Sequence, residues 1–168
     1  YKRQVWYGGG GFTPLLWTPR HEEIRRPDDA GGAPRETGWV SGCAMLVRRE
    51  VFERIGLLDP SYTIYCEDVD FCLRARQAGF SCAYAPDARV LHKVSSSSGG
   101  GMTPFKLEHR LRSTARLHRR FRGRAWRLLV APIHGAAFLL LVAGLLAAGR
   151  GRLAAAALRG AAGALRGR

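Results

Sequence analysis

Three carboxylates within four residues are the most concentrated chemistry in the chain. Glu67, Asp68 and Asp70 lie in the segment YCEDVDFCLRARQAGF at 65–80. A carboxylate placed against a hydroxyl can act as a general base and remove its proton. Two neighbouring carboxylates also repel each other, which raises the pKa of one of them and suits a base that works near neutral pH. The same acids could instead only cap a helix, so both interpretations are kept.

The residues that follow the acids predict a helix that would hold them. Apolar side chains recur at positions i, i+3 and i+4, which is the spacing of one buried helix face; they are Val69, Cys72 and Leu73. Arg74 and Arg76 suit the C-terminal end of a helix dipole, as the acids suit its N-terminal end. Gly79 is placed to end the helix.

The stretch before the acids predicts a strand and a short helix. Residues 38–47 form an apolar run, entered at Trp39, that indicates a buried strand. Its small residues at 41–44 would allow another group to pack closely on the backbone. Residues 48–55 predict a helix that ends at Gly56. Trp39 could face a sugar or be an ordinary core aromatic, and the sequence favours neither.

Two further stretches are considered as phosphate contacts, the glycine run at 8–11 and the segment around His92 and Lys93. The glycines at 8–11 do not fit a phosphate-binding loop motif, which favours a flexible turn at the rim of a site, followed by a surface loop at 18–37. His92 ends an apolar, strand-like stretch at 88–91 and is followed by Lys93 and a Ser/Gly run. Lys93 could touch phosphate, or the run could be a solvated hinge.

In combination, these motifs resemble a known family. The order GCAMLVRR, the Glu67–Asp68 pair, LRARQAGF and VLHK, within residues 38–92, is similar to the acceptor-side half of bacterial family 2 glycosyltransferases, especially rhamnosyl- and galactofuranosyltransferases. The resemblance implies an α/β fold, namely the C-terminal, acceptor-side half of a Rossmann-like GT-A fold over residues 1–105. A helical, membrane-associated tail would follow at 106–168. No Asp-x-Asp motif precedes the acids, so we expect a fragment that lacks the nucleotide-binding half and is incomplete for activity.

The resemblance also implies a reaction and its residues. The family moves a single sugar, with inversion, from a nucleotide-diphosphate sugar to a hydroxyl of a cell-envelope glycan or lipid-linked acceptor. Asp68 corresponds to the catalytic base, and Glu67, Asp70 and Trp39 would bind the acceptor. His92 would help to hold a divalent metal, Mg²⁺ or Mn²⁺, on the donor diphosphate. The Gln-x-x-Arg-Trp motif of processive relatives is absent, which favours single-sugar transfer.

The basic charge of the chain is concentrated in its tail. Residues 1–105 carry 13 Lys and Arg against 12 Asp and Glu, whereas residues 106–168 carry 14 against one. Such a charge could attract nucleic acid, but no nucleic-acid-binding motif accompanies it, so we expect no nucleic-acid partner. The four cysteines lack C-x-x-C spacing and predict reduced, mostly buried thiols in a cytoplasmic protein.

The tail predicts contact with a membrane. Residues 106–127 indicate a basic helix, and 128–148 form a run without a charged side chain, long enough for one spanning helix or a half-inserted hairpin. Residues 150–168 suggest a basic amphipathic helix lying on anionic lipid. We therefore expect a peripheral or single-pass protein at the cytoplasmic face of the inner or plasma membrane. A soluble helical bundle is the alternative for the tail.

A second function class stays open at this stage. The chain could be a non-catalytic membrane-binding module whose acids only cap a helix. The sequence encoded upstream of residue 1 separates the two, because the enzyme hypothesis expects a Rossmann-like half with an Asp-x-Asp motif there.

Overall fold

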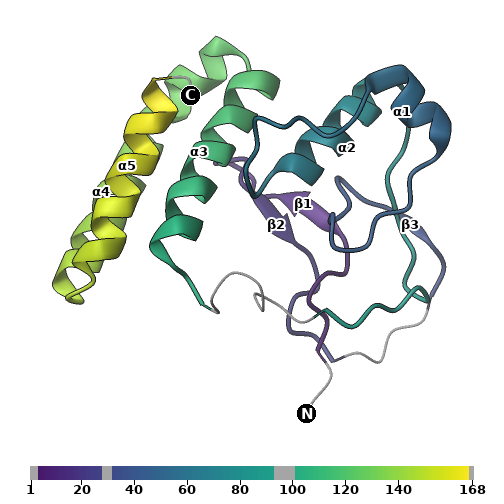
Figure 1. The fold of residues 1–168 in the computed structure, drawn as a ribbon, viewed down its shortest axis with the longest axis horizontal. Helices are drawn as coiled ribbons and strands as arrows, with labels where there is room; N and C mark the ends of the chain where they lie inside the picture. The colour runs from purple at the N-terminus through teal and green to yellow at the C-terminus, as the bar shows by residue number, and fades with distance from the viewer. Residues whose placement is uncertain (1–3, 28–31, 93–100, 167–168) are drawn as a thin grey trace. The chain divides into compact units, whose positions relative to one another are not determined.

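A computed structural model describes residues 4–27, 32–92 and 101–166 (Figure 1). The chain divides into two compact units. Unit 1 comprises Tyr1–Pro14, Thr18–Ser61 and Glu67–Lys93, and unit 2 comprises Leu15–Trp17, Tyr62–Cys66 and Val94–Arg168.

Two small antiparallel sheets occur in the part of unit 1 that the structure describes. Strand β1, Gly10–Phe12, pairs with β2, Pro19–His21, and strand β3, Arg35–Glu36, pairs with β4, Ala83–Tyr84. Figure 1 shows β1 and β2 side by side. The surface loop predicted at 18–37 is therefore partly wrong, because it contains β2 and β3.

The glycine run belongs to this sheet structure and is not the flexible turn that the sequence suggested. Gly10 lies in β1, is buried, and forms an isolated bridge with Trp39. A Cβ added at Gly10 would lie 2.5 Å from Cε2 of Trp39. Real side chains do not approach so closely, so the indole needs glycine at this position.

The two predicted helices of unit 1 are confirmed almost to the residue. Helix α1 spans Arg49–Ile55, and helix α2 spans Glu67–Gln77. Gly56 and Gly79 follow them with φ of 76° and 91°, a conformation in which glycine carries no Cβ penalty. Val51 of α1 and Phe71 and Ala75 of α2 form a buried core cluster. Partly buried side chains pack against that cluster: Met45, Val47, Phe52, Ile55 and Phe80.

The strands predicted at 38–47 and 88–91 are wrong. Within 38–47, Trp39 forms only an isolated bridge, and the chain turns at 42–44. The stretch 88–91 is irregular, with Val90 61% and Leu91 87% exposed. The contact of 38–47 with β1 is limited to the Trp39 bridge and to the Gly38 N–H, which donates to the Gly10 carbonyl at 2.8 Å. Among the described residues, neither run continues into a ladder of backbone hydrogen bonds with a neighbouring strand, and a strand requires such a ladder.

The described residues of unit 2 form three long helices. Helix α3 spans Pro104–Phe121, α4 spans Arg124–Ala147 and α5 spans Gly151–Leu165. The Thr103 side chain caps α3 by accepting the Lys106 N–H at 3.2 Å, which satisfies one of the free amides of the first turn. A non-helical break at 122–123 divides the single basic helix that was expected over 106–127.

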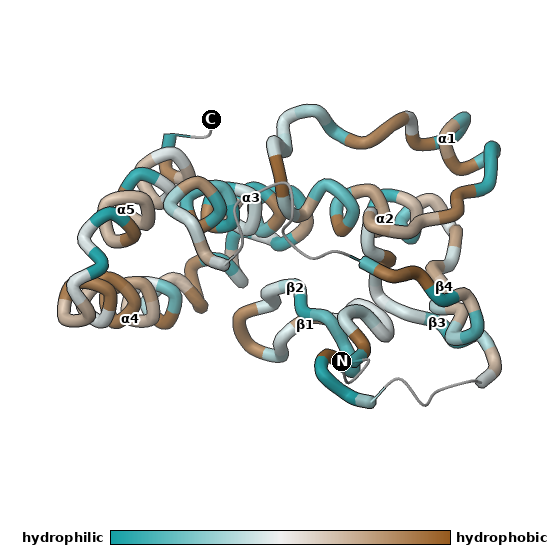
Figure 2. The backbone as a smooth tube through the Cα atoms, turned by 60° about the horizontal axis from the view of Figure 1, so that its bottom comes forward, coloured by the Kyte–Doolittle hydropathy of each residue, from teal (hydrophilic) through white to brown (hydrophobic). Residues whose placement is uncertain are grey.

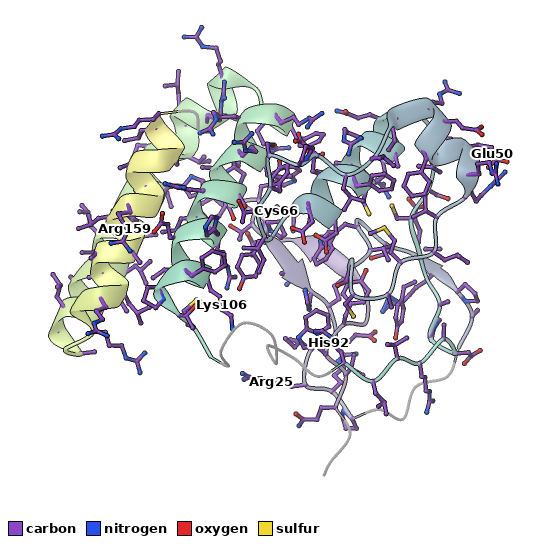
Figure 3. All side chains as sticks on the ribbon, viewed as in Figure 1. Arg25, Glu50, Cys66, His92, Lys106 and Arg159 are labelled. Atoms are coloured by element: carbon purple, nitrogen blue, oxygen red, sulfur yellow. The ribbon has the colours of Figure 1, made fainter. Side chains whose placement is uncertain are left out.

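Helix α5 packs along α3 through small residues (Figure 1). Its buried positions are Ala154, Ala156, Ala157, Gly160 and Gly163. Arg159, labelled in Figure 3, pairs with Glu108 of α3 at 3.0 Å. Because α3 covers the small-residue face of α5, any contact of this helix with lipid would use its other faces, and its placement on anionic lipid stays a prediction.

Helix α4 instead leaves its apolar side chains exposed. Leu128, Leu129 and Leu140 are each more than 70% exposed, and almost none of the apolar stretch is buried. Figure 2 shows the hydrophobic colouring along α4. In the described part of the chain, α4 is the one helix long and apolar enough to cross a membrane, which weakly suggests membrane association.

Candidate active site

The backbone that leads into α2 is in an unusual conformation. Tyr65 and Cys66 have φ of 67° and 65°, so two consecutive non-glycine residues occupy the left-handed region. Such residues cost about 1–3 kcal/mol each and cluster at functional sites. The chain turns tightly here, and Glu67 follows as the first residue of α2.

Asp68 is held by a backbone amide from the turn after Trp39. The Gly42 N–H donates to Asp68 Oδ2 at 2.9 Å, and the Val69 N–H donates to Oδ1 at 2.8 Å. Gly42 is exposed and Asp68 is half-buried. A carboxylate can accept about four hydrogen bonds, so Asp68 keeps lone pairs for a further hydroxyl. The small-residue segment thus approaches another group closely, as expected, but from a turn and not a strand.

The pKa of the Glu67 carboxyl is raised. Burial is the main cause, and the Asp68 carboxylate adds to it, while a backbone hydrogen bond of Glu67 opposes the shift. Oε2 of Glu67 has no accessible surface and no hydrogen-bond partner among the described residues. The sequence anticipated one raised pKa from like-charge repulsion, but here desolvation is the larger effect.

Asp70 cannot bind an acceptor as expected, because it is fully buried. Its Oδ2 pairs with Arg74 Nε at 2.8 Å. The same guanidinium donates to the carbonyls of Ile55 at 2.7 Å and Leu57 at 2.9 Å. Asp70 therefore holds an arginine that ties α2 to the segment following α1, and its role is structural.

Trp39 is a core aromatic, and the expectation of a sugar-facing platform is wrong. Its side chain is 3% exposed, and its indole N–H donates to the Gly11 carbonyl at 2.9 Å. The Tyr7 hydroxyl donates to the Trp39 carbonyl, and burial raises the pKa of Tyr7. A ring covered on this scale has no face left for an acceptor.

His92, labelled in Figure 3, is exposed, and its ring centroid lies 4.5 Å from that of Trp6. No group of three or more His, Cys, Asp or Glu able to hold a metal occurs among the described residues. Those residues thus do not build a divalent-metal site by themselves, because His92 offers a single donor. Lys93, the weaker phosphate candidate, lies outside the described residues.

A depression beside β2 was not anticipated from the sequence. It has a volume of about 560 Å³ and is lined by Arg20, His21, Glu22, Glu23, Ile24, Arg26 and Arg35. Arg35 pairs with Glu23 at 2.7 Å and lies over the Tyr84 ring at 4.9 Å. None of the predicted site residues lines it. Arg35 comes from a stretch of mixed charge without periodicity, so no sequence signal marked it.

Of the cysteines, Cys66, Cys72 and Cys82 are buried and Cys43 is exposed, and none of the four forms a disulfide within the described part of the chain. This agrees with the expectation of reduced, mostly buried thiols. Cys72 Sγ accepts the Val40 N–H at 3.2 Å, so this thiol helps to hold the segment after Trp39 against α2.

An adjacent acid pair at the start of a helix, in a mixed helix and strand unit, is the arrangement that the resemblance anticipated. The chain belongs to the family described as glycosyltransferase like family 2, whose model matches residues 22–125. Membership implies a GT-A type fold, and enzymes of this family typically use a divalent metal. It confirms the predicted family and the prediction of a glycosyltransferase, and it disfavours a non-catalytic membrane-binding module.

Individual relatives are similar over the same region. The chain is 39% identical over 92 residues to the N-acetylglucosaminyl-diphospho-decaprenol L-rhamnosyltransferase of Mycobacterium tuberculosis, covering 54% of this chain and 28% of the relative. It is 43% identical over 54 residues to rhamnosyltransferase WbbL of Escherichia coli, covering 32% and 20%. Human polypeptide N-acetylgalactosaminyltransferase 9 is 39% identical over 83 residues, covering 49% and 13%.

The matched region thus spans under a third of each of these relatives. No solved structure matches the chain.

Proposed function

We propose that the protein transfers a single sugar, with inversion, from a nucleotide-diphosphate sugar to a hydroxyl of a cell-envelope glycan or lipid-linked acceptor. The mycobacterial relative is named for an acceptor in which a diphosphate joins a sugar to a polyprenyl chain. We extend that acceptor class, a lipid diphosphate, to this protein. Residues 1–105 would be the acceptor-side part of the catalytic domain, and 106–168 the membrane-associated tail.

Asp68 is the proposed base. Its carboxylate would accept the proton of the acceptor hydroxyl while that oxygen attacks the sugar carbon and the nucleoside diphosphate leaves from the opposite side. The Gly42 N–H, 2.9 Å from Oδ2, holds the carboxylate in place. The observation that carries this assignment is that Asp68 is anchored yet half-exposed, whereas Asp70 is buried and paired.

Glu67 is proposed to bind the acceptor. Its carboxyl lies next to Asp68 at the start of α2, and each carboxyl oxygen can accept a hydrogen bond from a sugar hydroxyl. Its Oε2 atom has no hydrogen-bond partner among the described residues, which supports this role. A buried oxygen without a hydrogen bond is destabilising, and an acceptor hydroxyl could supply the missing bond.

His92 remains a candidate for one ligand of Mg²⁺ or Mn²⁺, and Lys93 a weaker candidate for donor phosphate. The described residues hold no group of three or more metal-ligating side chains around His92.

We further propose that the tail attaches the protein to the cytoplasmic face of the inner or plasma membrane, through α4 and the basic residues around it. The test is extraction of membranes first with concentrated salt and then with detergent. Salt screens surface charge but leaves apolar insertion intact, so an inserted α4 requires detergent. Release by salt would indicate surface attachment alone, and protein found free before either step would contradict membrane attachment.

The catalytic proposal is tested by Asp68→Asn in the intact protein. We expect turnover to fall by about 10²–10⁴-fold, the usual contribution of a general base, with donor affinity nearly unchanged. Asp87→Asn is the matched control, since Asp87 lies exposed in a turn and is expected to leave turnover unaltered. Equal activity of the Asp68 and Asp87 variants would remove Asp68 from the reaction.

A further inference from the structure

Unit 2 contains a cluster of aromatic and basic side chains that includes none of the proposed catalytic or acceptor-binding residues. We refer to it as the indole–arginine cluster; its members are Trp17, His118, Arg122, Trp126 and His134. His118 lies near the end of α3 and Arg122 in the break that follows. Trp126 lies in the first turn of α4, and His134 lies eight residues further along the same helix.

The guanidinium of Arg122 is held by two indoles. Its Cζ lies 4.9 Å from the ring centroid of Trp17 and 4.6 Å from that of Trp126. Aromatic faces attract a cation without neutralising its charge. Arg122 therefore keeps its full positive charge, and its side chain has already lost much of the freedom that ligand binding would otherwise remove.

Two imidazoles complete the cluster. The rings of His118 and His134 stack with centroids 5.2 Å apart, and Trp126 meets both rings edge-on, at 5.3 and 6.1 Å. His118 Nε2 lies 3.2 Å from the Trp17 carbonyl oxygen. Burial lowers the pKa of His118 to about 4, so this ring is neutral near pH 7 and can donate to that carbonyl.

Two nitrogen atoms of the cluster lack a partner. Nε of Arg122 and Nε2 of His134 have no accessible surface and make no hydrogen bond within the described residues. A polar group left in this state costs about 1–3 kcal/mol. The described part of the chain also pairs no carboxylate with Arg122, and Glu108 is the one acid beyond residue 105. The cluster thus offers fixed donors and uncompensated positive charge.

The position of the cluster in the sequence indicates which kind of anion it could bind. Arg124 and Arg127 lie beside it, and the apolar run of α4 begins at Leu128. Tryptophan and arginine at the start of an apolar helix are typical of the boundary between lipid and water. An anion bound here would therefore be attached to a lipid, and the forked donors of arginine suit phosphate oxygens.

We propose that the indole–arginine cluster binds a phosphate ester of a membrane lipid, with Arg122 as the principal contact. The phosphate could belong to the lipid diphosphate acceptor, in which case the inference rests on the proposed function, or to an anionic phospholipid. In the first case the cluster fixes the lipid end of the acceptor, and in the second it orients the tail on the bilayer.

The test measures binding of the intact protein to three sets of vesicles: phosphatidylcholine alone, phosphatidylcholine with phosphatidylglycerol, and phosphatidylcholine with undecaprenyl diphosphate at equal total charge. Arg122→Gln is compared with Arg124→Gln, which removes the same charge from an exposed position nearby. We expect Arg122→Gln to weaken binding to one of the two sets with added anionic lipid about tenfold or more beyond Arg124→Gln, as for the loss of a charged hydrogen bond.

The vesicle set affected identifies the source of the phosphate. Selective loss with undecaprenyl diphosphate supports acceptor binding, and selective loss with phosphatidylglycerol supports phospholipid binding. Equal losses for the two variants on every set would overturn the proposal, because only general charge would then matter. Arg122→Lys retains the charge without the planar fork and provides a second variant if Arg122→Gln does not fold; we expect it to bind more weakly than the unaltered protein.

The assay is independent of catalysis. Vesicle binding that depends on Arg122 in a protein without transferase activity would contradict the proposed function and leave the phosphate site standing. The reverse result would contradict the phosphate site alone.

Discussion

The two units of the molecule differ in how their helices pack. Unit 1 buries the carboxylate of Asp70 and satisfies it with Arg74, and its core is made of side chains of different sizes, such as Val51 and Phe71. Unit 2 holds α3 against α5 through alanine and glycine and leaves the leucines of α4 exposed. Unit 1 is thus built as a water-soluble protein is.

The packing in unit 2 is of a kind common in membranes. Small residues that let helix backbones approach closely are characteristic of helices packed within lipid, where burying apolar area gains little. The difference shows that a single stability argument does not suit the whole chain. Unit 1 should be sensitive to loss of paired charge, and unit 2 to any increase in side-chain size between its helices.

The largest effect that would sharpen this comparison is expected for Asp70→Asn. Removing one partner of a buried ion pair leaves Arg74 uncompensated and costs about 3–5 kcal/mol. Denaturant unfolding of the intact protein in detergent measures it. Arg48→Gln is the control, because its ion pair with Glu50 is exposed and exposed pairs add little to stability. Equal effects of the two variants would show that the Asp70 pair is not a structural element.

A smaller effect is expected between α3 and α5. A Cβ at Gly160 would lie 2.8 Å from the backbone oxygen of Glu108. Gly160→Ala therefore forces the helices apart and should cost about 1–3 kcal/mol, as other overpacked sites do. A Cβ at Gly144 in α4 meets nothing within 4 Å, so Gly144→Ala should be neutral or stabilising by up to about 1 kcal/mol. Thermal unfolding of both variants provides the measurement. A stabilised Gly160→Ala protein would contradict close packing here.

The smallest effect concerns pH. Burial raises the pKa of Glu67 above its ordinary value of 4.5, so the folded protein binds more protons than the unfolded chain as pH rises from that value to the raised one. The stabilising contribution of the neutral carboxyl is fully present below 4.5 and is lost through this window. Glu67→Gln should remove that decline, whereas Glu53→Gln, at an exposed position, should retain it. The unfolding free energy is measured for each variant across a pH series. If Glu67→Gln shows the same dependence on pH as the unaltered protein, burial of Glu67 is not the cause of the decline.

Helix α2 could be predicted because its signals are local. Its periodicity, its acidic first turn and the glycine after its end all lie within 67–79. The i, i+4 spacing of Asp70 and Arg74 was also visible and could have marked Asp70 as structural. The burial of Asp70 could not be predicted in the same way, because the Arg74 side chain that pairs with it also donates to the carbonyls of Ile55 and Leu57, which lie outside α2.

The errors at Trp39 and at the two predicted strands have a different cause. Trp39 is buried because Gly10, far earlier in the chain, leaves room for its indole. The run at 38–47 is apolar enough for a strand, but sheet formation depends on a partner that composition does not reveal. Nonlocal contacts decide both outcomes, and a single sequence without relatives shows no trace of them.

The central claim is that Asp68 acts in catalysis whereas Asp70 stabilises the fold, and one experiment tests it directly. Turnover and unfolding free energy are measured for Asp68→Asn and Asp70→Asn in the intact protein. We predict that Asp68→Asn loses turnover but keeps its unfolding free energy within about 1 kcal/mol of the unaltered protein, as for the loss of one hydrogen bond. For Asp70→Asn we predict that the main effect is a lower unfolding free energy. A stable Asp70→Asn protein without turnover, beside an active Asp68→Asn protein, would place the catalytic role on the other carboxylate and contradict the account.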